Sequence, residues 1–382
     1  MNLPPVLSRL FRNRAFQWAV GVFVVLFVVA EVGVYLARNY DPVRVPYRRW
    51  RAESPYKYEE IDPRYLKTDP ATLITVRSPE EADRVRAALI DVIWGADGLP
   101  RGKQPASIEP GYSDPAFEGM KNLAGIDRVR VEMEHGIYSI AYHFRPVRTN
   151  GRMVLYHHGY AGDVREMADL IGALVAEGYN VIALNFLGYG ENWFASEIHY
   201  PKWGWYKTSV HRLLSLEAHP LKYFIEPAVV AANYAEAMGF SDADMIGLSA
   251  GGWVTELVAA VDPRIRRSYP VAGGYPLFLR SGAEANQAPP PQYDPKLLQT
   301  ADYLDIYVLG AVGAGRRQLQ IFNRFDRCCY RNILARLYEP AVKAAVSEIG
   351  KGSFAVLIDE THADHKISEF GRAAILKDLA EP

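Results

Sequence analysis

Cysteine is scarce in this sequence. The chain of 382 residues holds two cysteines, Cys328 and Cys329, and they are neighbours. A single adjacent pair excludes a framework of disulfides, and it lacks the paired spacing of a structural zinc site. We expect both side chains to be small buried hydrophobic groups rather than redox centres. Stability must therefore come from the burial of apolar side chains.

An excess of charge of one sign is also missing. The chain has 43 lysines and arginines against 44 aspartates and glutamates, which leaves a formal net charge of -1. This balance provides no basic field over the whole chain for binding nucleic acid. Because 49% of the residues are hydrophobic, the composition also excludes an intrinsically disordered chain. We expect a globular protein without a nucleic-acid partner.

One long apolar run lies near the N-terminus. Residues 16–36 carry one charge, Glu31, and a helix of about 21 residues spans the hydrocarbon core of a bilayer. The alternative is a cleaved signal peptide, but its apolar stretch is normally shorter, and residues 34–37 offer no good cleavage site. We expect residues 1–37 to form a short tail and a single-pass membrane anchor.

The charges on either side of this run leave the orientation open. A short tail before one apolar helix normally stays in the cytoplasm, but the positive-inside rule mildly opposes that arrangement here. Three arginines precede the run and five follow it: Arg9, Arg12 and Arg14, then Arg38, Arg44, Arg48, Arg49 and Arg51. The side of the membrane that carries the rest of the chain stays undecided.

Residues 38–127 are expected to be a juxtamembrane linker followed by a helical extension of the main domain. Residues 39–77 are rich in proline, tyrosine and arginine and show no sustained period. A helix then begins at Ser78, the predicted N-cap, with Glu81 completing a capping box, and it ends at Gly95. Its apolar stripe indicates that it packs on the domain: Val85, Ala88, Leu89, Val92 and Ile93. Residues 96–126 are expected to be irregular.

From residue 128 to residue 382, predicted strands and helices alternate, which is typical of an α/β fold. A hairpin with its turn at His135 and Gly136 comes first. Alternation implies crossover connections and a mostly parallel sheet with helices on both faces. The expected strands are 128–133, 137–144, 153–157, 180–184, 244–247, 267–272, 318–322 and 354–358, and the expected helices lie near 164–177, 226–238, 251–260, 330–348 and 366–379.

Two insertions interrupt this alternation. Residues 186–224 are aromatic-rich, and they either line a binding pocket above the sheet or pack as a loop cluster. Their aromatic side chains are Phe186, Trp193, Phe194, Tyr200, Trp203, Trp205, Tyr206, Tyr223 and Phe224. Residues 273–317 contain a proline run and a predicted helix over 303–308, and they form either a lid or a surface excursion.

The strongest motif is Gly-Leu-Ser-Ala-Gly-Gly over residues 247–252, between a predicted strand and a predicted helix. A nucleophile elbow is a strained turn that needs small neighbours, so Gly247 and Gly251 relieve crowding while Ser249 projects its hydroxyl. This motif alone occurs often as an ordinary turn. Its place between a strand and a helix favours a nucleophilic serine.

With this motif in place, residues 128–380 resemble the α/β-hydrolase superfamily of serine esterases and lipases. The resemblance implies that Ser249 attacks an acyl group, that a histidine carries the proton, and that a carboxylate orients the histidine. It also implies the chain order serine, acid, histidine, with the last two residues following the last two strands. No cofactor and no metal ion are expected.

The acid is expected in the loop after the predicted strand 318–322, where Asp326 matches the position of the family's acid. The alternative role for Asp326 is to cap the next helix. Asp359 and Glu360, after the following strand, are weaker candidates.

Two histidines compete for the role of base. Both lie between the last predicted strand and the last helix, and the family's base often stands just before that helix, which favours His365 over His362. The one left over would be a neighbouring hydrogen-bond donor or an exposed loop residue. A metal site at the two histidines is disfavoured, because the sequence suggests no third ligand.

The oxyanion hole needs two backbone N–H groups aimed at the developing negative charge. Ala250, directly after the serine, is the first expected donor. Residues 157–163 resemble the family's His-Gly loop, and Tyr160 within it is the second. The same loop is also a glycine-rich turn that leads to a helix N-cap at Asp163.

These features predict a membrane-anchored serine hydrolase that cleaves a carboxylic ester through an acyl-enzyme. The expected partners are a small acyl substrate and the membrane, and the oligomeric state stays open. Two alternatives remain: an amide or peptide hydrolase with the same triad, and an inactive protein that uses the fold for binding.

Overall fold

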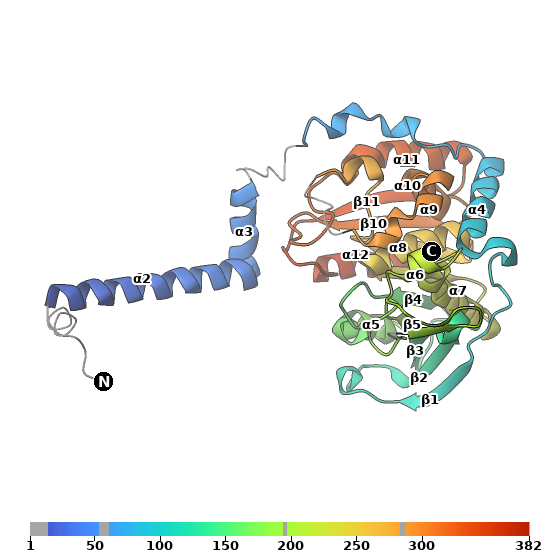
Figure 1. Ribbon diagram of the computed structural model, residues 1–382, viewed down its shortest axis with the longest axis horizontal. Coiled ribbons are helices and arrows are strands. Elements are labelled where there is room, and N and C mark those ends of the chain that lie inside the picture. Colours follow the sequence, from blue (N-terminus) through green and yellow to red (C-terminus); the bar gives the residue numbers. More distant parts are fainter. Residues whose placement is uncertain (1–13, 53–60, 194–196, 283–287, 382) are drawn as a thin grey trace.

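The computed structural model describes residues 14–52, 61–193, 197–282 and 288–381 (Figure 1). The N-terminal helix α2 (Arg14–Asn39) projects away from an α/β domain, and α3 (Asp41–Ala52) contacts that domain through an ion pair of Arg44 with Asp364. The predicted tail over residues 1–13, with Arg9 and Arg12, lies outside the described residues. Phe194 of the aromatic insertion also lies outside them.

Within the described residues, nine strands form one sheet in the order β1-β2-β3-β5-β4-β8-β9-β10-β11. The pairs among β1, β2, β3 and β5 are antiparallel, and the pairs from β5 through β11 are parallel. The bounds are β1 (Ser107–Tyr112), β2 (Leu123–Glu132), β3 (Tyr138–Pro146), β4 (Met153–His157), β5 (Asn180–Leu184), β8 (Ala243–Leu248), β9 (Ile265–Val271), β10 (Arg317–Asn323) and β11 (Ser353–Asp359). The predicted, mostly parallel sheet is confirmed.

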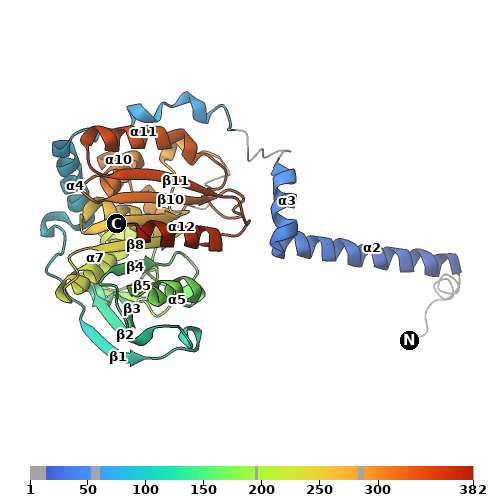
Figure 2. The same cartoon turned by 180° about the vertical axis from the view of Figure 1, so that it is seen from behind.

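Helices cover both faces of this sheet (Figures 1 and 2). Successive side chains of a strand point to opposite faces, so Leu155 of β4 joins one apolar core while Val154 and Tyr156 join the other. Two helices pack on the second face: α5 (Ala168–Ala176) and α12 (Glu369–Ala380). The first face is covered by α4 (Pro79–Trp94), α7 (Lys222–Ala237), α8 (Ala250–Val261), α10 (Tyr303–Ala311) and α11 (Ala335–Ile349).

The central strands are buried along their whole length and mostly apolar, because both of their faces are covered. Every residue of β4, β5 and β8 is buried, which is typical of parallel strands between two helical layers. Their carboxyl ends meet at one edge of the sheet. In open α/β sheets, ligands bind at that edge, so the loops after β4, β8, β10 and β11 are where a site is expected.

The capped helix predicted before the domain is present as α4. The hydroxyl of Ser78 accepts a hydrogen bond from the Glu81 N–H at 3.2 Å, and Gly95 ends the helix with a φ of 66°. Val85, Leu89 and Ile93 are buried against the core, whereas Ala88 of the predicted stripe is exposed. The helix is therefore an integral part of the first helical layer.

The edge of the sheet differs from the expectation for residues 96–126. This segment was expected to be irregular, but it contains β1 and the first residues of β2. The sheet thus begins at Ser107, ahead of residue 128. Strand β1 is mostly exposed and carries a glycine and a proline, so it lacks the alternating apolar pattern that marks a half-buried strand.

The helical part of the second insertion, residues 273–317, forms neither a lid nor a surface excursion. The predicted helix at residues 303–308 is present as α10, and each of its residues is buried. It packs between α8 and α11 in the first core. The helix is buried on all sides, and its one acidic residue, Asp305, accepts hydrogen bonds from the N–H groups of Thr75 and Val76, so α10 belongs to the interior. A short helix, α9 (Pro295–Thr300), precedes it.

The apolar N-terminal run forms the predicted helix. Residues 14–37 of α2 are long and apolar enough to cross a membrane, and that window is not buried against any other part of the structure. Val25 and Val28 expose 61% and 53% of their surface. A signal sequence can pass the same test of length and composition, so this finding establishes an apolar helix that a bilayer can accommodate.

We predict that acidification destabilises the fold through His157 at the end of β4. Burial lowers the pKa of His157 to about 4, whereas an unfolded histidine titrates near about 6.5. Between these values the unfolded chain binds more protons, so the unfolding free energy should fall by up to about 1.4 kcal/mol per pH unit as the pH falls. Urea unfolding at a series of pH values measures this slope.

The control for this prediction is His157→Gln, which removes the titrating group. Its slope should be smaller, though not zero, because burial also lowers the pKa of His143 and His158. An unchanged slope in the variant would contradict the assignment to His157.

Candidate active site

The turn between β8 and α8 has the geometry of a nucleophile elbow. Ser249 has φ 59° and ψ -124°, a backbone conformation that L-residues rarely adopt. Its N–H donates to the carbonyl oxygen of Val271 on β9 at 2.8 Å, which fixes the turn to the sheet. The serine is the residue before the first turn of α8, and its side chain is partly exposed.

The glycines of the motif are required by close backbone contacts. A Cβ at Gly247 would lie 2.1 Å from the carbonyl oxygen of Gly251, and a Cβ at Gly251 would lie 2.0 Å from that of His157. Real Cβ atoms do not approach oxygen this closely, so neither position admits a side chain. The sequence argument for small residues around Ser249 therefore has a specific cause, the packing of α8 against the end of β4.

The predicted acid and base meet at the ends of β10 and β11. Oδ2 of Asp326 lies 2.7 Å from Nδ1 of His365. Asp326 is fully buried, and the His365 side chain is 19% exposed. Nε2 of His365 is buried and has no hydrogen-bond partner among the described residues. That nitrogen is the one left to exchange a proton.

The second histidine has a different partner. Nε2 of His362 lies 3.3 Å from Oδ2 of Asp359, the last residue of β11. Asp359 also accepts hydrogen bonds from Ser368 and Thr361. Burial raises the pKa of this carboxyl, but the hydrogen bonds outweigh burial and lower the pKa to about 2. Asp359 and His362 thus form a separate buried pair that supports the loop before α12.

The His-Gly loop connects the serine with the histidine. A Cβ at Gly159 would lie 2.7 Å from Cβ of Ser249, so this loop touches the elbow. Burial lowers the pKa of His158, and the nearby charge of His365 adds to that lowering. The loop therefore packs against the elbow of Ser249 and lies within electrostatic range of His365. No hydrogen bond joins Ser249 to His365 among the residues that the structure describes.

Two backbone N–H groups beside Ser249 are available as donors. In the described part of the chain, no hydrogen bond is formed by the N–H of Ala250 or by that of Tyr160. Ala250 begins α8, where the first N–H groups of a helix lack partners within the helix. Asp163 also caps the next helical turn by accepting from the Arg165 N–H at 2.9 Å, so both predicted roles of this loop are compatible.

The aromatic insertion divides into a buried and an exposed part. The Tyr160 ring lies 4.5 Å from that of Phe186, and its hydroxyl lies 2.6 Å from Nε2 of His211. The insertion therefore packs onto the His-Gly loop. Farther out, the hairpin of β6 (Glu197–Tyr200) and β7 (Gly204–Lys207) leaves Trp203 and Trp205 exposed by 67% and 72%.

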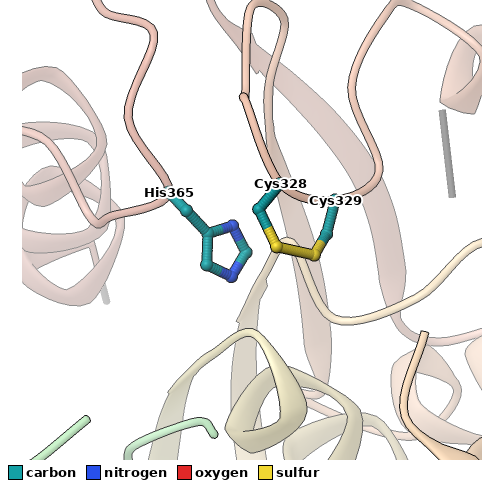
Figure 3. A group of neighbouring side chains, drawn as sticks. All are labelled: Cys328, Cys329 and His365. Carbon is teal, nitrogen blue, oxygen red and sulfur yellow. A yellow bond between two sulfur atoms is a disulfide. The ribbon is translucent and has the colours of Figure 1, made fainter. Parts of the chain in front are cut away.

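The expectation for the two cysteines is corrected by the structure. Cys328 and Cys329 form a disulfide with each other, directly after the loop that carries Asp326. Figure 3 shows this disulfide beside the imidazole of His365. The sequence already places the two cysteines next to Asp326, and they were expected to be small buried hydrophobic groups because that is their commoner role.

Two clusters within the described residues have ligand atoms close enough to hold a metal ion: Cys328, Cys329 and His365, and Glu134, His135 and Glu217. In the first, both sulfurs are used by the disulfide. In the second, Glu134 is paired with Lys222 and Glu217 with Tyr200.

A cavity of about 800 Å³ lies at the opposite edge of the sheet from the serine, where β8 and β10 begin. Its lining includes Arg86, Arg316 and Lys351.

Comparison with solved structures identifies the fold. The methylesterase BT1017 matches with a TM-score of 0.59 at 18% identity, over 83% of this chain and 66% of its own. Acetyl xylan esterase 1 from a Thermoanaerobacterium species matches with a TM-score of 0.51 at 16% identity, over 85% and 100%. An acetyl xylan esterase from a Paenibacillus species has a TM-score of 0.51 at 17% identity, over 81% and 98%. No protein-family model and no curated protein sequence matches the chain.

The chain has the α/β-hydrolase fold. In this fold, the order of the site residues along the chain agrees with the positions of Ser249, Asp326 and His365 after β8, β10 and β11. At this level of identity, the comparisons establish the architecture, and the roles of these side chains are inferred from their geometry.

We predict that the two histidines of the α/β-hydrolase domain respond differently to the same substitution. His365→Asn should lower kcat by about three orders of magnitude, because the histidine that meets Asp326 is the predicted proton carrier. His362→Asn should leave kcat within about tenfold and instead lower the unfolding free energy by about 1–3 kcal/mol, because Asp359 loses a buried partner. Steady-state kinetics and urea unfolding measure both effects.

Each variant is the matched control of the other, since both substitutions fall in one loop. A large loss of kcat in His362→Asn with a small one in His365→Asn would reverse the assignment.

Proposed function

We propose that this protein is a serine hydrolase that cleaves carboxylic esters with Ser249, His365 and Asp326. The observation that carries the proposal is the contact of Asp326 with His365 at 2.7 Å, which leaves Nε2 of the histidine unpartnered. The elbow conformation of Ser249 supports the same conclusion. A strained non-glycine residue at a strand-to-helix turn is typical of a nucleophile.

In the proposed acylation step, Ser249 Oγ attacks the ester carbonyl carbon while Nε2 of His365 takes the hydroxyl proton. Asp326 accepts the hydrogen bond from Nδ1–H, which selects the tautomer with a free Nε2 and stabilises the protonated ring. The tetrahedral intermediate then collapses. The ester C–O bond breaks, His365 returns the proton to the alkoxide, and an alcohol leaves.

The negative charge of the intermediate would be stabilised by the N–H groups of Tyr160 and Ala250. Both are without a hydrogen-bond partner among the described residues, so they need no rearrangement before they donate. Removal of one such donor costs about 2.7–4 kcal/mol of transition-state stabilisation where it has been tested. The N-terminus of α8 points its partial positive charge at the same place.

Deacylation repeats these roles with water as the nucleophile. His365 takes a proton from water, the oxygen attacks the acyl carbon, and the bond to Ser249 Oγ breaks as the proton returns to it. The products are a carboxylic acid and the free serine. No external electron carrier or metal enters this balance.

The ester class is favoured over the alternatives by the structural neighbours. The three solved structures described above are a methylesterase and two acetyl xylan esterases. An amide hydrolase would use the same triad, and a binding protein would use the fold without the chemistry. A binding protein without activity is disfavoured because the acid, Asp326, and the base, His365, are in contact.

We predict that Ser249→Ala abolishes both ester hydrolysis and covalent labelling by a fluorophosphonate probe, since the probe reacts with an activated serine hydroxyl. Activity of the wild-type chain should be measured on p-nitrophenyl esters of graded acyl length and on matched p-nitroanilides. Ester turnover should exceed amide turnover for the same acyl group.

The control is Ser241→Ala, which removes an exposed hydroxyl near the start of β8. It should label and turn over like the wild type. Failure of the wild type to label, or equal labelling of Ser249→Ala, would exclude the proposed enzyme, while faster amide turnover would favour the alternative substrate class.

We also propose that α2 anchors the chain in a membrane. Its apolar window is exposed to its surroundings on all sides, which in water would leave a large apolar surface unburied. Glu31 lies in the second half of the helix, halfway between the middle and the end of the apolar run 16–36, where a charge is less costly than at the bilayer centre.

We predict that the full chain stays in the membrane fraction after washing with alkaline carbonate. The double variant Val25→Arg/Val28→Arg should move to the soluble fraction with its esterase activity intact, because each arginine at the centre of a span costs about 2.5–3.5 kcal/mol. Recovery of a wild-type chain that begins after residue 37 would instead identify a cleaved signal sequence.

A further inference from the structure

A disulfide stands beside the acid and base of the proposed triad. Figure 3 shows the His365 ring next to the bonded sulfurs, with an edge of the imidazole turned toward Cys328. A ring nitrogen of His365 and the two sulfurs lie within 4.8 Å of one another. The disulfide therefore packs against the His365 ring, while Nδ1 of the ring meets Asp326 and Nε2 keeps no hydrogen-bond partner among the described residues.

The same two cysteines hold the acid through their backbone. Oδ1 of Asp326 accepts hydrogen bonds from the N–H of Cys328 at 2.7 Å and from that of Cys329 at 3.3 Å. Oδ2 is left for His365. The bonded pair closes a small ring that includes the peptide bond between the two cysteines. The N–H of Cys329 belongs to that peptide, so its direction depends on the ring being closed, whereas the N–H of Cys328 belongs to the peptide just before the ring.

The chain is also fixed on the far side of the disulfide. Tyr330 follows with a positive φ of 51° and is 1% exposed. Its hydroxyl donates to Oε1 of Gln292 at 2.7 Å, and Gln292 in turn donates to the carbonyl oxygen of Gly273 at 2.8 Å. The disulfide therefore links a rigid buried anchor to the Asp326 carboxylate.

We propose that the Cys328–Cys329 disulfide is a redox modification site that positions Asp326 and His365, so that its reduction slows the chemical step. This inference rests on the proposed function, because it assigns the disulfide a role at the same triad. The cysteines are positioning residues. They act on the substrate through Asp326 and His365.

The reaction that opens the site is a thiol–disulfide exchange with a dithiol. Cys328 is partly exposed and Cys329 is 4% exposed, so the thiolate of the reductant attacks the sulfur of Cys328, and Cys329 leaves as a thiolate that takes up a proton. The second thiol of the reductant then attacks its own bound sulfur and releases Cys328. The protein gains two electrons and two protons, and the dithiol becomes a disulfide.

Opening the ring frees the peptide between the cysteines to rotate, so the N–H of Cys329 no longer holds Oδ1 of Asp326 in place. Hydrogen bonds to charged groups are stronger than neutral ones. We expect the weakened hold to lower kcat about tenfold, which is the order of one such bond. KM should not change, because neither cysteine is needed to bind the acyl group in the ground state.

The experiment uses the full chain in detergent, oxidised and after treatment with dithiothreitol, with kcat and KM measured on a p-nitrophenyl ester. Alkylation and mass spectrometry count the free thiols in each sample. The chain has two cysteines in all, so the reductant has no other disulfide in it to open. Ser249→Ala measures the background hydrolysis of the ester by the reductant itself.

The matched control is Cys328→Ala/Cys329→Ala, which cannot form the ring. It should show the low kcat of the reduced wild type, an unchanged KM, and no response to dithiothreitol. Reoxidation of the reduced wild type should restore kcat. Because reduction needs no substitution, a variant that fails to fold does not remove the test.

Two results would overturn the inference alone: full kcat in wild type that carries two free thiols, or full kcat in the double variant. Either result would show that the two N–H groups bond to Asp326 in an ordinary aspartate turn, which forms without a disulfide. Absence of fluorophosphonate labelling in the oxidised wild type would instead overturn the proposed function and this inference with it.

Discussion

The site depends on the in-register parallel pairing of the central strands. Asn323 at the end of β10 pairs with Asp359 at the end of β11, and His157 at the end of β4 pairs with Gly247 on β8. Because these parallel strands end in register, the loops that follow them begin at the same level along the sheet. Three loops that are distant in the sequence therefore begin within a few residues of one another at one edge of the sheet.

Close backbone packing at this edge leaves little freedom to the loops. The end of β4 touches α8 at Gly251, and the His-Gly loop touches the elbow at Gly159. The N–H of Arg324 donates to the carbonyl oxygen of Asp359 at 2.8 Å, which ties the acid loop to the end of β11. A site held by backbone contacts is positioned before substrate arrives, which is what electrostatic stabilisation of a transition state requires.

Two carboxylates near this edge are buried, and both are held by hydrogen bonds from neighbouring groups. Asp359 gathers hydrogen bonds from the loop that follows it, and its pKa falls to about 2, so it stays ionised as a structural support. Asp326 divides its oxygens between two backbone N–H groups and His365. A buried carboxylate without such partners would be neutral or would unfold the loop. The two acid–histidine pairs thus share one physical solution and serve different ends.

Sequence patterns alone determined much of the architecture. The alternation of apolar runs predicted the parallel sheet, the caps around Ser78 and Gly95 predicted α4, and the small residues at 247–252 predicted a strained turn, because each of these depends on residues close together in the chain. The expected chain order of serine, acid and histidine followed from the resemblance to the α/β-hydrolase superfamily. These local signals suffice wherever neighbouring residues decide the conformation.

The tertiary structure decided what depends on distant contacts. His362 and His365 lie in one loop, and the path of that loop over β10 and β11 decides which of them meets Asp326 and which meets Asp359. Burial of α10 depends on the faces of α8 and α11, and β1 exists because β2 offers it a free edge. The sequence places the cysteines two residues after Asp326, but their contact with His365 depends on where the acid loop and the loop after β11 meet.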